Sequence, residues 1–175
     1  FPPRRAGAYV FVDPAKHDLF VFGAQCLVDL YRFRLDDSSG WEKLPIAGDG
    51  PPNCAPRRGE WTWGLPVFDP IGHRILDFFG SDLINGSLDQ VWALPLDTPR
   101  TWTRLETTGP SPRGRFDYSL MFDPARNRVL LFGGAWRYNP VSDFPVDLGD
   151  LWAFSLDSLR WAPIPFTGGP GPRRE

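Results

Sequence analysis

The sequence predicts an all-β protein made of three copies of one four-stranded unit. Three passages align with one another: "AYVFVDPAKHDLFVFGA", "GLPVFDPIGHRILDFFGS" and "YSLMFDPARNRVLLFGGA". Their shared aspartates, Asp13, Asp69 and Asp123, lie 56 and 54 residues apart. The composition agrees, because 14 Phe and 8 Trp among 20 Pro and 18 Gly favour short strands joined by tight turns over helices.

Each unit supplies four strands in order. The first two flank an Asp-Pro turn, where Pro fixes φ and Asp can accept a hydrogen bond from the backbone two residues ahead. The second strand ends in a glycine, and a third strand with alternating apolar residues follows. A short fourth strand carries the last tryptophan of the unit: Trp41, Trp102 or Trp161. Strand-like units with a period near 55 residues are typical of β-propeller blades.

The repeated unit resembles the kelch repeat. The matching features are the leading arginine (Arg5 and Arg115), the F-D-P turn, the "FGG" of unit three, the "D-x-W" of the third strand and the closing tryptophan. Units one and two depart from this pattern with "FGA" and "FGS". The resemblance covers essentially the whole chain. It implies an arc of three four-stranded antiparallel blades, formed by residues 1–52, 53–109 and 110–169, with 170–175 opening a fourth unit.

An arc leaves two flanks to be covered. The chain ends on "GPGPRRE", which repeats the phrase "PPRR" near its start. We expect either a segment of a larger propeller of about six or seven blades or half of a dimeric ring, in which two copies close head to tail. Under both expectations the outer faces of units one and three are apolar and need a partner, which is the remaining blades or a second copy.

Residues that recur in every unit are interpreted first as parts of the scaffold. His17, His73 and Asn127 share one position, and His and Asn are enriched at positive φ, so we expect left-handed turn residues and no metal site. The leading arginine could bind an anionic ligand or partner through Arg5 and Arg115. The favoured alternative is that it bonds carbonyls or an acidic group of the adjacent blade, as would Arg58 and Arg174.

The chain holds two cysteines, Cys26 and Cys54, in the loop between the second and third strands and in the link to unit two. These two positions emerge on the same face of a four-stranded meander, so a disulfide is allowed and would indicate an oxidising compartment. Two free thiols are the favoured interpretation.

The loop between the second and third strands (the 2–3 loop) lengthens along the chain, and in unit three it reads "GAWRYNPVSDFPVDLG". Loops carry the individuality of a repeat scaffold, and Trp, Tyr and Arg dominate binding hot spots. The predicted partner-binding residues are therefore, besides the two arginines, Trp136, Arg137, Tyr138, Asp143, Phe144 and Asp147. Two alternatives stay open: the loop folds back on its own blade, or Asp143 and Asp147 bind calcium.

The sequence favours a binding scaffold for a protein or other ligand, with no cofactor. A net charge of −2 with dispersed basic residues gives no footprint for nucleic acid, and no apolar run approaches the length of a membrane span. No nucleophile elbow, phosphate loop or zinc pair is visible, so catalysis is not expected. The alternatives are a propeller enzyme, oxidase-like or carbohydrate-active, whose site lies in other blades, and a structural part of a larger assembly.

Overall fold

The computed structural model describes residues 1–24, 27–37, 39–48, 50–51, 65–79, 90–136 and 146–172. They form three four-stranded antiparallel sheets, which confirms the predicted all-β repeat fold. Sheet 1 consists of β1 (Tyr9–Asp13), β2 (Asp18–Ala24), β3 (Leu27–Arg34) and β4 (Trp41–Leu44). Sheet 2 consists of β5 (Leu65–Asp69), β6 (Arg74–Phe79), β7 (Gln90–Pro95) and β8 (Thr103–Leu105). Sheet 3 consists of β9 (Ser119–Asp123), β10 (Arg128–Phe132), β13 (Leu151–Ser155) and β14 (Arg160–Pro163).

The third sheet carries two additions. A short two-stranded ribbon of β11 (Ala135–Trp136) and β12 (Val146–Asp147) follows β10 and precedes β13. A single 3-10 turn, η1 (Pro124–Arg126), lies between β9 and β10. The described residues contain no helix long and apolar enough to cross a membrane.

The Asp-Pro turns form as the sequence predicts. The Asp13 carboxylate accepts a hydrogen bond from the backbone N–H of Ala15 at 2.9 Å, and Asp69 does the same for Ile71 at 3.0 Å. The shared His/Asn position has positive φ in all three hairpins: 53° at His17, 45° at His73 and 43° at Asn127. This confirms the interpretation of these residues as left-handed turn positions.

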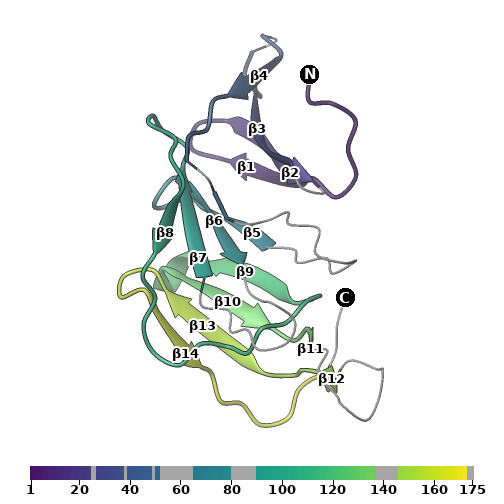
Figure 1. The fold of residues 1–175 in the computed structure, drawn as a ribbon, viewed down its shortest axis with the longest axis vertical. Helices are drawn as coiled ribbons and strands as arrows, with labels where there is room; N and C mark the ends of the chain where they lie inside the picture. The colour runs from purple at the N-terminus through teal and green to yellow at the C-terminus, as the bar shows by residue number, and fades with distance from the viewer. Residues whose placement is uncertain are drawn as a thin grey trace.

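The three sheets follow one another in a row, with sheet 2 between sheets 1 and 3 (Figure 1). One apolar cluster joins sheets 1 and 2. Sheet 1 contributes Phe20, Phe22, Leu30 and Leu44, while sheet 2 contributes Ile75, Leu94 and Trp102, all between 0 and 5% exposed. Because consecutive strand residues point to opposite faces, alternate residues of each strand build this junction.

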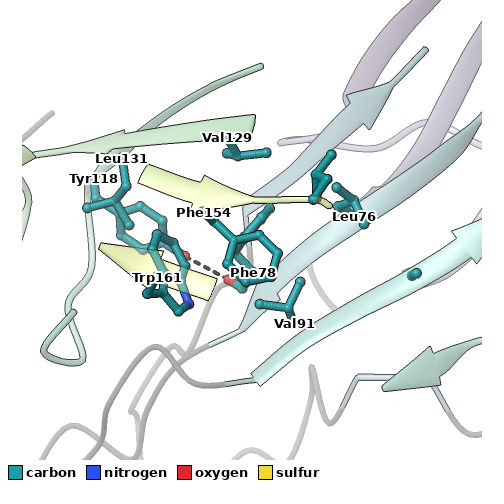
Figure 2. Close-up of a cluster of buried hydrophobic side chains, with 10 residues drawn as sticks. Leu76, Phe78, Val91, Tyr118, Val129, Leu131, Phe154 and Trp161 are labelled. Carbon is teal, nitrogen blue, oxygen red and sulfur yellow. Dashed lines mark hydrogen bonds between the residues drawn. The ribbon is translucent and has the colours of Figure 1, made fainter. Parts of the chain in front are cut away.

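A second cluster joins sheets 2 and 3. Phe78 of β6 meets the rings of Phe154 and Trp161 at centroid distances of 5.6 and 5.7 Å. Tyr118, which precedes β9, reaches across the junction and donates a hydrogen bond from its hydroxyl to the Phe78 carbonyl at 2.7 Å (Figure 2). Burial, together with the nearby Asp77 carboxylate, raises the pKa of Tyr118, so this hydroxyl stays a donor.

Backbone bonds fix how each sheet is joined to the next. The segment after β4 pairs with the chain before β8, since Ala47 donates to the Arg100 carbonyl at 2.8 Å and accepts from Trp102 at 3.1 Å. The segment after β8 repeats the arrangement with sheet 3: Thr108 donates to Leu159 at 2.8 Å and accepts from Trp161 at 3.0 Å. Each linker therefore extends the next sheet by one bridge beside its closing tryptophan.

Candidate functional site

The 2–3 loops and the segments leading into each sheet emerge at one end of the sheets, because every sheet is a four-stranded meander. The tight hairpins that contain His17, His73 and Asn127 lie at the opposite end. We call the first end the loop face. The described members of the predicted partner-binding set belong to this face: Arg5, Arg115, Trp136 and Asp147.

Arg5 is held inside sheet 1 at the loop face. Its guanidinium donates to the Gly23 carbonyl at 2.9 Å and to the Asp29 carboxylate at 3.0 Å. It also lies over the Tyr31 ring, 5.3 Å from the centroid. The Asp29 hydrogen bond raises the pKa of Arg5, and its side chain is 6% exposed.

Arg115 repeats this arrangement in sheet 3. It donates to the Gly133 carbonyl at 2.9 Å and to the Asp150 carboxylate at 2.9 Å, and its side chain is 0% exposed. Asp150 also accepts from the Trp152 indole N–H at 2.7 Å. Although burial opposes it, these hydrogen bonds lower the pKa of Asp150, so the carboxylate stays charged.

The two arginines thus close their own sheets. Each bonds a glycine at the end of the second strand, Gly23 or Gly133, and an aspartate at the start of the third, Asp29 or Asp150. The acceptors belong to the arginine's own sheet and not to the adjacent one, which corrects the expectation drawn from the sequence. Arg5 and Arg115 are therefore omitted from the contact surface proposed below. Arg58 and Arg174 lie outside the described residues.

Trp136 stands on a rigid stem formed by the ribbon. Trp136 pairs with Val146, and Ala135 pairs with both Asp147 of β12 and Phe116 of the leading segment. Gly134 makes the stem possible, because its φ is 93° and a Cβ there would lie 2.8 Å from the Phe116 carbonyl oxygen. Ala135 is therefore held between β12 on one side and the segment leading into sheet 3 on the other.

The guanidinium of Arg113 lies over the Trp136 ring at 3.9 Å from the centroid. Arg113 is exposed, and its backbone carbonyl accepts a hydrogen bond from Arg115 Nε at 3.0 Å. Trp136 is half-buried, Val146 is 42% exposed and Asp147 is exposed. The buried Arg115 thus positions the leading segment, and that segment places a cation over the face of a half-buried aromatic ring.

Several predicted residues have no structural account. Arg137, Tyr138, Asp143 and Phe144 lie outside the described part of the chain, as do Cys26 and Cys54. The calcium alternative involves Asp143 and falls outside it too. Among the described residues, no group of three or more His, Cys, Asp or Glu side chains is placed to hold a metal ion.

The structure adds one polar cluster that the sequence interpretation missed. At the hairpin end, His73 Nδ1 contacts Asp97 at 2.8 Å, and its Nε2 lies 3.1 Å from Asp13 of sheet 1, within ion-pair distance but without hydrogen-bond direction. Lys16 of sheet 1 binds Asp97 at 2.9 Å. Aligning the units shows only that His73 occupies a turn. Comparing each unit with its successor would have paired Asp13 and Lys16 with His73 and Asp97.

Four-stranded antiparallel sheets in series, with a leading arginine bonded to the glycine and aspartate around the 2–3 loop, define a blade-type β-repeat protein. The family model described as the KLHDC2/KLHL20/DRC7 Kelch-repeats domain matches residues 1–175. The chain therefore belongs to the kelch-repeat family, as the sequence resemblance predicted.

Two relatives from Caenorhabditis elegans match parts of the chain. Host cell factor homolog hcf-1 is 31% identical over 83 residues, which cover 45% of this chain and 10% of the relative. Putative protein tag-53 is 29% identical over 66 residues, which cover 37% of this chain and 5% of the relative. The matched region thus spans a tenth or less of the length of these relatives.

Proposed function

We propose that the chain is a non-catalytic protein-binding scaffold whose contact surface is the loop face of sheet 3, centred on Trp136 and Arg113. Kelch-repeat domains generally mediate protein binding. The observation that carries the proposal is the stacked pair itself, at 3.9 Å, on a stem tied to the sheet by backbone pairing. A half-buried tryptophan beside an exposed arginine provides two of the three residue types most enriched in binding hot spots.

Pre-organisation supports the same proposal. The ribbon and the Arg115 hydrogen bonds fix Trp136 and Arg113 before any partner arrives, so little side-chain entropy is lost on binding. Arg137, Tyr138, Asp143 and Phe144 belong to the same loop in sequence and remain predicted contacts. His17 and His73, the only histidines, are engaged by carboxylates at the opposite end, which favours a scaffold over an enzyme.

The test begins with a peptide ligand selected on the wild-type chain from a displayed random library. Its dissociation constant is then measured by calorimetry for Trp136→Ala and Arg113→Ala. We expect Trp136→Ala to weaken binding about 30-fold or more, as for a hot-spot residue. Ile71→Ala is the matched control, because Ile71 is 59% exposed on a hairpin at the opposite end. Equal affinity of all three variants would refute the proposed surface.

We also propose that the three sheets are an arc of a larger propeller. The two outward faces of the row support this, because each presents apolar residues whose counterparts pack, partly buried, against the clusters at the internal junctions. Val12 on sheet 1 and Met121 on sheet 3 are 51 and 66% exposed. Apolar surfaces of this kind indicate a covering partner.

A further inference from the structure

The outward face of sheet 1 is equivalent to the face of sheet 2 that packs against sheet 1. Its strands place Val12, Leu19, Phe33 and Trp41 side by side in one row. Trp41 occupies the position of Trp102 and Trp161, which are 5 and 0% exposed, yet Trp41 itself is only partly buried. The difference follows from position in the row: sheets 2 and 3 each have a preceding sheet packed on this face.

The outward face of sheet 3 is equivalent to the faces with which sheets 1 and 2 pack against the sheet that follows them. Leu130 and Phe132 of β10 point away from sheet 2, because Val129 and Leu131 point into the internal cluster. Their counterparts in sheet 1, Phe20 and Phe22, are both 2% exposed, and those in sheet 2, Leu76 and Phe78, are both 0% exposed. In sheet 3 the two residues are only partly buried, and Phe166 beyond the sheet is 46% exposed.

A linker with the required backbone shape follows sheet 3. Ala47-Gly48 and Thr108-Gly109 make the bridges at the two internal junctions, and the glycines have φ of 84° and 82°. Thr167-Gly168 occupies the same place after β14, with φ of 74°. A Cβ on Gly109 would lie 2.7 Å from the Trp161 carbonyl oxygen, whereas one on Gly168 would have no atom within 4 Å. The third linker thus has the shape of the other two, without a sheet packed on it.

Charges at the hairpin end indicate which sheet fits there. At the junction of sheets 1 and 2, Lys16 faces the His73–Asp97 pair. On sheet 3 the position of Lys16 is taken by Arg126, whose side chain is 67% exposed. On sheet 1 the position of the His73–Asp97 pair is taken by His17 and Asp36, which already contact each other at 2.9 Å and are 59 and 72% exposed.

A cation facing a His–Asp pair can form in only two pairings of sheets: sheet 1 with sheet 2, and sheet 3 with sheet 1 of another chain. At the junction of sheets 2 and 3 the cation is replaced by Gly72 and the histidine by Asn127, so that junction lacks the charged set. A cation facing a His–Asp pair would arise again if sheet 3 of one chain met sheet 1 of another. Charge, apolar rows and linker shape therefore select the same partner.

We propose that the outward face of sheet 3 binds the outward face of sheet 1 of a second copy of this chain. Two copies make this contact twice and close a ring of six sheets about a two-fold axis, within the size range of known propellers. In each contact Thr167 pairs with the backbone of Ser39 and Trp41, Trp41 becomes buried, and Arg126 faces Asp36. This inference rests on the proposal of a larger propeller and names the chain that completes it.

The first test is the mass of the 175-residue chain in solution by sedimentation equilibrium over a range of concentrations. We expect a species of twice the 19.8 kDa chain mass. Trp41→Ala should weaken dimerisation about 30-fold or more while the far-ultraviolet circular dichroism stays unchanged. Ile71→Ala, away from both flanks, should have no effect. A monomer at all concentrations, or a dimer insensitive to Trp41→Ala, would overturn the second-copy proposal.

A charge swap tests the orientation of the two copies. Arg126→Glu and Asp36→Arg should each weaken the dimer a few-fold, as expected for an exposed ion pair, and the double variant should recover most of the loss. Additive losses in the double variant would contradict the head-to-tail arrangement.

A tandem fusion of two copies of the 175-residue chain separates this inference from the larger-propeller proposal. If the single chain is monomeric but the fusion protects Trp41 from fluorescence quenchers, the larger ring survives and the second-copy association fails. If Trp41 stays accessible in the fusion as well, both proposals fail.

Discussion

The two junctions between the sheets share one backbone arrangement but are closed by different side chains. At both, the residue before the linker glycine bridges the chain beside the next tryptophan. Sheets 2 and 3 are joined by the rings of Phe78, Phe154 and Trp161 and by the Tyr118 hydroxyl. Sheets 1 and 2 add the charged contacts of Lys16 and His73 at their hairpin end.

The comparison divides the contacts into those that both junctions share and those that only one junction has. The apolar rows and the bridging linker occur at both, so they set the register in which sheets stack. The polar contacts occur at one position or another and can be exchanged without changing that register. Variants that remove a shared element should therefore cost more stability than variants that remove an individual one.

The shared tryptophan should give the largest effect. Trp161→Ala is expected to lower the free energy of unfolding by about 3–5 kcal/mol, because a fully buried ring is lost from a packed core. Trp102→Ala should approach this value, while Trp41→Ala should change the unfolding free energy of the single chain much less. Urea denaturation of the three variants, at protein concentrations where the chain is monomeric, provides the measurement. Equal losses at Trp41 and Trp161 would contradict the distinction between an internal junction and the outward face of sheet 1.

Tyr118→Phe should have a smaller effect at the same junction. The change keeps the ring but leaves the buried Phe78 carbonyl without its 2.7 Å donor, which is expected to cost about 1–3 kcal/mol. Tyr31→Phe is a matched control, since Tyr31 is buried on the outward face of sheet 1 and not at an internal junction. The comparison would fail if the two variants unfolded with the same midpoint.

The repeat made most of the fold predictable. Aligning Asp13 with Asp69 and Asp123 placed the turns, and the closing tryptophans placed the fourth strands, because three copies of a pattern average out local ambiguity. The positive φ of His17, His73 and Asn127 followed from the same alignment. The recurrence of the leading arginine also predicted a structural role, and Arg5 and Arg115 have that role through hydrogen bonds within their own sheets.

Features without a counterpart in the other units could not be predicted. Among the described residues, the ribbon of β11 and β12 occurs only beside sheet 3, and its pairing depends on Phe116 and Gly134 meeting in space. The stacking of Arg113 on Trp136 depends on that ribbon. The contact of His73 with Asp13 crosses between units, so no pattern within a single unit contains it.

The pH dependence of stability should test the Arg115–Asp150 contact at the loop face of sheet 3. The folded state lowers the pKa of Asp150, so its contribution to stability is present above the ordinary aspartate pKa of about 3.9 and is lost as the pH falls through the lower folded value. Asp150→Asn should therefore lose less stability than the wild type between pH 7 and about pH 3. Urea midpoints at the two pH values measure this. Glu106→Gln changes an exposed linker residue and should show the same change in urea midpoint between the two pH values as the wild type.

Exchanging His73 and Asn127, which occupy the same turn position at the two junctions, should give the smallest effect. His73→Asn keeps a residue that accepts positive φ but removes the contacts with Asp13 and Asp97, so we expect a loss of up to about 1 kcal/mol. The reverse change, Asn127→His, should bring no gain, because Asp69 is already held by Arg74 Nε at 2.8 Å and Gly72 provides no cation. Thermal unfolding of both variants measures the asymmetry. Equal and opposite shifts would mean that the charged contacts belong to the shared junction after all, and that the two junctions differ only in sequence and not in mechanism.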